Sequence, residues 1–139
     1  DPISDDTRKI IKLNRNINNL GFKKDIRSFL AASDCLVLPS YREGFPNVVL
    51  QAGSMQVPSI VSDINGCNEI IHNDINGLLV QPKNIESLHF AMKKILLDKK
   101  LYDSMVRLSR KNIVENFRRD IFFKKVLLQY SNLIRYDRK

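Results

Sequence analysis

The sequence predicts an α/β fold in which a Rossmann-like parallel sheet is flanked by helices, and three observations indicate it. The run 34–39, DCLVLP, is continuously apolar from Cys35 onward, and residues 58–63, PSIVSD, form a second predicted buried strand; such runs are typical of strands covered on both faces. Helical patterns separate and follow these runs, as right-handed crossovers between parallel strands require. The length of 139 residues suits a single domain with a substantial core.

The first third of the chain carries two predicted helices and one weak strand. Ser4 can cap a helix that runs to about Asn14, with acidic residues in its first turn, where the helix dipole favours them. Residues 16–22, NINNLGF, are a short and weak strand candidate. Residues 24–33, KDIRSFLAAS, have apolar residues on one helical face, and the buried strand 34–39 follows them.

The middle of the chain continues this alternation. Residues 46–55, PNVVLQAGSM, are predicted to be helical, with Pro46 tolerated in the first turn. The strand 58–63 ends at the turn pair Asn65-Gly66, and residues 78–80, LLV, form a short third strand.

From Asn84 onward the apolar period is helical. Asn84 can cap a helix, and two further helices are expected at about 101–115 and 120–136. We expect each stripe to face the core: Ile85, Leu88, Met92, Ile95 and Leu96 in the first of these helices, and Phe123, Val126, Leu127, Tyr130 and Ile134 in the last.

Composition favours a cytoplasmic protein. No apolar run approaches the length of a membrane span, and the start DPISDDTRK is not a signal peptide. The two cysteines, Cys35 and Cys67, form no metal-binding or CxxC pattern, so we expect reduced thiols, with Cys35 as a small core residue.

The net charge of +8 lies entirely in the last part of the chain. Residues 1–98 hold eleven basic and eleven acidic residues, whereas residues 99–139 hold twelve basic and four acidic ones. Such a block suits an anionic membrane, nucleic acid, an acidic partner or simply a solvated helix face. No RNA-binding aromatic pattern or helix-turn-helix signature accompanies it, which argues against nucleic acid.

The loop 40–46 is the main candidate for a binding site. In a parallel sheet ligands lie beyond the carboxyl ends of the strands, on loops that lead into helices. Gly44 permits close backbone approach, and the free amides of the following helix favour an anion such as phosphate. Glu43 suits a sugar hydroxyl, but the residues alone leave open that it merely caps the helix while Ser40 closes the turn.

Three stretches carry a family resemblance: SDCLVLPSYREGFPNVVLQA, PSIVSDINGCNEII and NGLLVQPKN. In order and spacing they resemble the carboxyl-terminal, donor-binding half of family 4 (group 1) glycosyltransferases of the GT-B fold. The resemblance is strong over residues 16–98 and looser beyond. It implies a retaining enzyme that takes a sugar from a UDP- or GDP-linked donor to a polysaccharide or lipid-linked acceptor, without a bound metal or other cofactor.

The resemblance also assigns site residues. It implies that Glu43 is the catalytic-site carboxylate that holds donor-sugar hydroxyls. It implies that Gln51 stands where the family has a second, ribose-binding carboxylate, a loss of roughly 1 kcal/mol or more of charge-assisted bonding. Arg42 occupies a variable position. The amides implied to hold the sugar and diphosphate belong to Gly44, Phe45, Asn47 and Val48.

Two turns complete the comparison with the family. Gln56 replaces the usual glycine after the helix, so we expect a left-handed residue that costs about 1 kcal/mol. Gly66 and Glu69 match the family's Gly-x-x-Glu turn, in which we expect Glu69 to be a structural cap rather than a ligand contact.

The resemblance implies that residues 1–139 form one partial donor domain, inactive alone, with 120–136 as the helix that crosses back to a missing amino-terminal acceptor domain. The missing strands would leave one flank of residues 34–39 open, so either residues 1–22 cover it or two copies of the chain pair there. We expect the segment 99–139 to meet the inner membrane face peripherally. A non-catalytic relative or a basic binding module remains an alternative, and neither sugar, nucleotide, acceptor nor linkage can be named.

Overall fold

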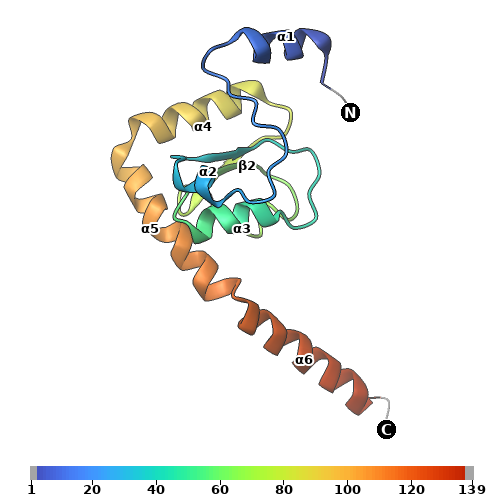
Figure 1. The fold of residues 1–139 in the computed structure, drawn as a ribbon. Helices are drawn as coiled ribbons and strands as arrows, with labels where there is room; N and C mark the ends of the chain where they lie inside the picture. Colours follow the sequence, from blue (N-terminus) through green and yellow to red (C-terminus); the bar gives the residue numbers. More distant parts are fainter. Residues whose placement is uncertain (1–2, 137–139) are drawn as a thin grey trace.

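The computed structural model describes residues 3–136, with side chains through Ile134. Three strands and six helices alternate much as the sequence predicts (Figure 1). In chain order they are α1 (Asp5–Leu13), α2 (Arg27–Ala31), β1 (Leu36–Leu38), α3 (Asn47–Ser54), β2 (Ser59–Ser62), β3 (Gly77–Val80), α4 (Ile85–Leu97), α5 (Lys99–Asn116) and α6 (Arg119–Tyr136).

The three strands form one parallel sheet in the order β1-β2-β3, which confirms the predicted fold class. Ile60 of the central strand lies opposite Val37 on one side and Leu78 on the other. All four residues of β2 are buried, as a central parallel strand requires. The helices α3 and α4 cover opposite faces of the sheet (Figure 1).

Each face of the sheet has its own apolar cluster. On the α3 face, Val61 packs with Val49 of α3 and Ile113 of α5. On the α4 face, Ile60 packs with Ile95 of α4 and Met105 of α5. Because α5 contributes to both clusters, it ties the two helical layers together.

The predicted caps of two helices are confirmed. The hydroxyl of Ser4 accepts a hydrogen bond from the amide of Thr7 at 3.2 Å, and the side chain of Asn84 accepts one from Ser87 at 2.9 Å. The prediction for α3 needs a small correction. Pro46 precedes the helix as its N-cap residue and forms no side-chain cap, so it does not lie within the first turn.

The strand predicted at residues 16–22 is wrong. This segment is an irregular connection whose residues are all exposed, with Ile17, Leu20 and Phe22 at 41%, 49% and 94%. The side chain of Asn19 accepts a hydrogen bond from the amide of Gly21 at 3.2 Å, and Gly21 has φ of 60°. Such local bonds give the backbone an alternative to a strand ladder.

The burial predicted for the stripe of α4 is only partly right. Ile95 is buried and Leu88 half-buried, but Ile85, Met92 and Leu96 are 82%, 44% and 77% exposed. Ala91 replaces them as the second fully buried residue. A three-stranded sheet covers only a narrow stripe of the helix, which leaves much of its apolar surface free.

The buried stripe predicted for the last helix is wrong. α6 extends away from the body of the molecule (Figure 1), so four of its five predicted core residues are exposed and only Val126 is half-buried. Lys124 and Lys125 are exposed, as expected for residues near the surface. Arg138 and the side chain of Arg135, which belong to the same basic segment 99–139, lie outside the described residues.

The strand β1 lies at the edge of the sheet and pairs only with β2. Its three residues are half-buried rather than covered on both faces as expected. Among the described residues no backbone hydrogen bond joins 3–22 to β1, so the prediction that residues 1–22 cover this edge is not fulfilled. Pairing of two copies through it stays a prediction.

Gln56 adopts the predicted left-handed conformation after α3, with φ of 64°. We expect Gln56→Gly to raise the free energy of unfolding by about 1 kcal/mol, because glycine reaches this conformation without the Cβ penalty. Gln51→Gly, at an exposed position inside α3, is the control and should lower it by about 1 kcal/mol. Urea denaturation measures both values, and an unchanged or lowered stability of Gln56→Gly contradicts the assignment.

Candidate functional site

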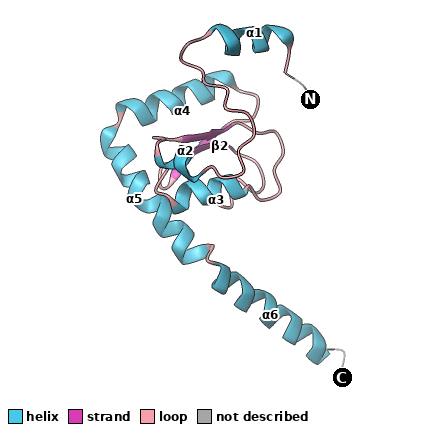
Figure 2. Ribbon diagram, viewed as in Figure 1, coloured by secondary structure: helices cyan, strands magenta, loops and turns pink. Residues whose placement is uncertain are grey.

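The loops that follow the strands lie together at one end of the sheet (Figure 2). The loop after β1 and the turn after β2 enclose a hollow of about 400 Å³ there. The hollow is lined by Tyr41, Arg42, Glu43, Ile64 and Asn65. This is the position at which a parallel sheet presents a ligand.

A close backbone contact holds the two walls of this hollow together. Gly66 has φ of 81°, and a Cβ atom placed on it would lie 2.2 Å from the carbonyl oxygen of Gly44 and 3.3 Å from the amide nitrogen of Phe45. No other residue type fits both the conformation and the contact. The turn 64–67 therefore packs directly on the loop that carries Glu43.

Glu69 stabilises the same turn from within. Its Oε1 atom accepts a hydrogen bond from the amide of Gly66 at 3.2 Å. This confirms the prediction that Glu69 is a structural cap. The carboxylate fixes the turn that supports the site.

The start of α3 offers free donors beside the hollow. Among the described residues, the amide N–H groups of Gly44, Phe45, Asn47 and Val48 have no hydrogen-bond acceptor. In contrast, α1, α4 and α5 each have a side-chain cap. An uncapped helix start has unsatisfied amides and a partial positive charge, and both favour an anion.

The side chain of Phe45 serves the fold rather than the hollow. Its ring packs against that of Phe117, at the end of α5, with 5.7 Å between the ring centroids. Phe45 does not line the hollow, so its backbone amide is the group that the family resemblance assigns to a ligand there.

Glu43 is half-buried, and its carboxylate forms no hydrogen bond or ion pair with any residue of the range 3–136. It therefore does not cap α3, which removes the purely structural interpretation of this residue. Ser40 does close the turn, since its hydroxyl donates to the carbonyl of Arg42 at 3.4 Å. The Glu43 carboxylate is thus a free hydrogen-bond acceptor in the lining of the hollow, which the cationic Arg42 also lines.

Neither cysteine is activated as a nucleophile. Burial raises the pKa of the Cys67 thiol, and the nearby negative charge of Glu43 raises it further. Burial also raises the pKa of Cys35 to about 11. Both thiols are free and stay protonated at neutral pH, which excludes thiolate chemistry at the site.

Gln51 lies apart from the hollow. It is exposed on α3, one turn beyond Asn47 and on the same face of the helix, and its side chain has no hydrogen-bond partner among the described residues. The structure thus brings Glu43 and the four amides together at one place, while Gln51 flanks them along α3.

Sequence reasoning missed one wall of the site and a second hollow. Ile64 and Asn65 line the first hollow, although Asn65 was assigned only to a turn. A second hollow, of about 280 Å³, lies beyond the carboxyl ends of all three strands, and Tyr41 lines both this hollow and the first one. The ammonium of Lys83 lies 5.4 Å from the centre of the Tyr41 ring. Only the motif Gly66-x-x-Glu69 signalled that the turn belongs to the site.

Two features are absent from the described part of the chain. It contains no cluster of three or more His, Cys, Asp or Glu side chains suited to a metal ion. None of its helices is both long enough and apolar enough to cross a bilayer.

The sequence profile of the family described as "Glycosyl transferases group 1" matches residues 7–112. The chain belongs to this family. It is 37% identical over 107 residues to the UDP-Gal:alpha-D-GlcNAc-diphosphoundecaprenol alpha-1,3-galactosyltransferase of Escherichia coli, covering 77% of this chain and 27% of that protein. It is also 33% identical to the N,N'-diacetylbacillosaminyl-diphospho-undecaprenol alpha-1,3-N-acetylgalactosaminyltransferase of Campylobacter jejuni. That match extends over 119 residues, which are 86% of this chain and 31% of that protein. The chain thus spans about a third of the length of these relatives.

Solved structures confirm the GT-B class of fold. Anabaena Alr3699/HepE in complex with UDP-glucose matches 91% of this chain and 35% of its own, with a TM-score of 0.82 and 20% identity. The C-terminal domain of a glycosyl transferase group 1 family protein (LpcC) from Francisella tularensis has a TM-score of 0.72 and 26% identity. The match covers 81% of this chain and 60% of that structure.

The contact at Gly66 yields a stability prediction. Gly66→Ala should lower the free energy of unfolding by the left-handed penalty of about 1–2 kcal/mol and by a further 1–3 kcal/mol, roughly, for the clash with Gly44. Gly21→Ala is the matched control, because Gly21 has φ of 60° but no atom within 4 Å of the added Cβ. Equal losses for the two variants, measured by urea denaturation, would show that the turn does not press on the loop.

Proposed function

We propose that this chain is the nucleotide-sugar-binding part of a retaining glycosyltransferase that extends a lipid-linked or polysaccharide acceptor. One observation carries the proposal: the Glu43 carboxylate, which has no partner within residues 3–136, stands directly before four backbone amides that have none there either. A nucleotide sugar presents the matching groups, which are hydroxyls for the carboxylate and a diphosphate for the amides. Family membership supports the same assignment.

The diphosphate binds at the start of α3 in this proposal. The amides of Asn47 and Val48 donate to phosphate oxygens, and the helix dipole stabilises their charge. The exposed Gly44 lets the ligand approach the backbone closely. Arg42, which lines the hollow, adds a mobile positive charge at its rim.

The sugar lies over Glu43. A carboxylate accepts strong hydrogen bonds from hydroxyls, and these bonds hold the donor sugar in one orientation relative to the acceptor. Gln51 lies one turn farther along α3, on the same face as Asn47, and in this proposal it meets the ribose. As a neutral side chain it both donates to and accepts from ribose hydroxyls, without the charge-assisted strength of a carboxylate.

The named relatives support the substrate class. The Escherichia coli relative is named for a UDP-linked galactose donor and an acceptor on diphosphoundecaprenol, and the Campylobacter jejuni relative for a diphospho-undecaprenol acceptor. The Anabaena neighbour is described with UDP-glucose. We therefore favour a UDP-linked donor and a lipid diphosphate acceptor, with the protein held peripherally on the cytoplasmic membrane face.

A non-catalytic relative is the second candidate, and the neutral Gln51 favours it. The two are distinguished by turnover. A catalytic protein transfers sugar from the donor, whereas a non-catalytic relative binds nucleotide sugar and leaves it intact.

The role of Glu43 can be tested in the full-length enzyme. Glu43→Ala should lower kcat/KM for the nucleotide sugar by about 10- to 100-fold, since a hydrogen bond to a charged group contributes roughly 1.5–3 kcal/mol. Isothermal titration with UDP and with the UDP-sugar locates the lost contact. The variant should bind UDP with unchanged affinity and the UDP-sugar with lower affinity.

Glu86→Ala is the control for this experiment, because Glu86 is exposed on α4, away from the hollow. It should leave both affinity and turnover unchanged. An unaltered kcat/KM for Glu43→Ala, with a folded variant, would refute the assignment.

A further inference from the structure

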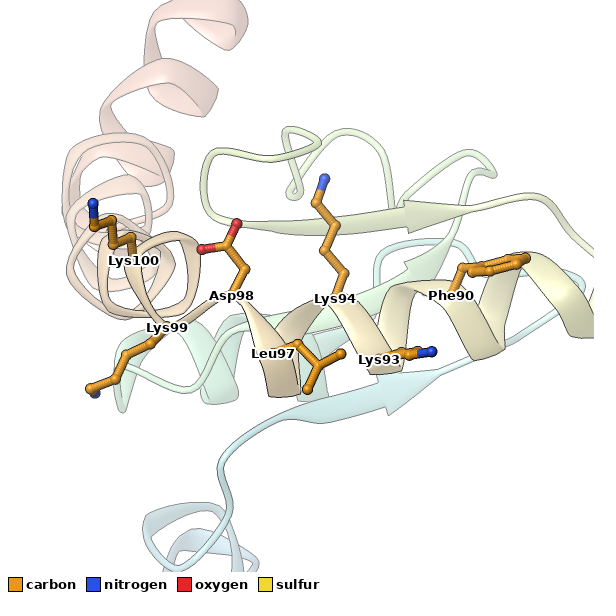
Figure 3. Close-up of a pocket in the computed structure, with 7 residues that line it drawn as sticks. All are labelled: Phe90, Lys93, Lys94, Leu97, Asp98, Lys99 and Lys100. Atoms are coloured by element: carbon orange, nitrogen blue, oxygen red, sulfur yellow. The ribbon is translucent and has the colours of Figure 1, made fainter.

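The junction of α4 and α5 carries a second, unassigned surface. A shallow hollow of about 690 Å³ lies there, on the outer side of α4 and away from the loops of the site (Figure 3). We call it the α4–α5 surface. It is formed by Phe90, Lys93, Lys94, Leu97, Asp98, Lys99 and Lys100.

The apolar part of the α4–α5 surface is large and open. Phe90 and Leu97 are 65% and 72% exposed, and they stand two turns apart on the same face of α4. Exposed apolar side chains that lie together on one helix face make that face a candidate for an interaction.

The charged part of the surface is basic. Lys94 pairs with Asp74 at 2.6 Å, and Lys99 pairs with Asp103 at 3.2 Å. Asp98 is occupied as the cap of α5, where it accepts from the amide of Leu101 at 3.0 Å. Lys93 and Lys100 form no ion pair with any residue of the described range, so they provide the free positive charge.

The two kinds of side chain are interleaved. Phe90, Lys93, Lys94 and Leu97 follow the spacing of one helical face, and Figure 3 shows Lys93 between Phe90 and Leu97. Interfacial helices have this composition: apolar side chains enter the headgroup region, while lysine stems extend so that the ammonium groups stay at the phosphates. Nucleic acid would not use the apolar residues, and a protein partner would favour a continuous apolar core with fewer lysines.

We propose that the α4–α5 surface docks on an anionic phospholipid bilayer. The positive charge of the surface complements the lipid phosphates, and its exposed apolar residues match the acyl boundary. The proposal rests on the proposed function in one respect, since a lipid-linked acceptor lies at a membrane. It assigns membrane contact to α4 and the start of α5 rather than to α6.

The test is partitioning of the full 139-residue chain onto vesicles of phosphatidylglycerol and phosphatidylcholine in equal parts, in 100 mM salt. Lys93→Gln combined with Lys100→Gln should lower the partition coefficient about 30-fold, because each lysine near an anionic surface contributes about 1 kcal/mol. Phe90→Ser combined with Leu97→Ser should lower it at least 10-fold. Vesicles of phosphatidylcholine alone should bind weakly in every case.

Three control pairs complete the design. Lys23→Gln with Lys24→Gln removes the same charge from an exposed loop, and Phe22→Ser with Ile75→Ser removes exposed apolar residues elsewhere. Lys124→Gln with Lys125→Gln tests α6. A loss in these controls equal to that of the α4–α5 variants, or no loss in the latter, would overturn the proposal.

Nucleotide binding separates this inference from the proposed function. All the vesicle variants should keep the affinity for UDP, measured by isothermal titration, because they lie away from the hollow at Glu43. Vesicle binding with no nucleotide binding would refute the function and leave the membrane contact. If the chain binds nucleotide but the α4–α5 variants partition onto vesicles as the unaltered chain does, the proposed function stands and the membrane contact is refuted.

Discussion

The contact between Gly66 and the backbone at Gly44 and Phe45 is the constraint on which the candidate site depends. It joins the turn after β2 to the loop after β1, and a Cβ atom at Gly66 would lie only 2.2 Å from the Gly44 carbonyl oxygen. The turn is held in shape by Glu69, and the loop leads directly into α3. The position of Glu43 and the direction of the free amides both follow from this junction, because neither segment can shift without the other.

Helix α5 supports the junction from behind. Ile113 lies so close to Gly53 that a Cβ there would be 2.8 Å from its Cγ1 atom, and Arg110 donates to the carbonyl of Ser54 at 3.0 Å. Phe117 packs on Phe45. The basic carboxyl-terminal segment therefore has an inner face that fixes α3 and an outer face that carries charge. Helix α5 thus supports the site with one face and contributes to the α4–α5 surface with its first turn. The positive charge of residues 99–139 can therefore serve these two roles and does not require a nucleic-acid ligand.

Sequence reasoning predicted what depends on local pattern. The positions of the three strands of the sheet and the caps Ser4 and Asn84 depend on neighbouring residues, and the structure confirms them, although only β2 is fully buried. The left-handed Gln56 and the structural role of Glu69 were expected from the family resemblance, and both are found. The sequence-based predictions failed where the burial of a helix face depends on which other elements pack against it. The stripes of α4 and α6 have the period of buried helices, yet a three-stranded sheet covers only part of the first and none of the projecting second. The wall formed by Ile64 and Asn65 arises from packing between distant segments, which periodicity cannot show.

The central claim is that the loop after β1 and the start of α3 bind a nucleotide sugar. The most direct measurement is a nuclear magnetic resonance titration of the nitrogen-15-labelled chain with UDP-glucose. The account predicts the largest amide shift changes at Gly44, Phe45, Asn47 and Val48, with smaller ones at Gly66 and Cys67 through the backbone contact. Absence of shifts at saturating nucleotide, or shifts confined to α4, α5 and α6, would contradict it.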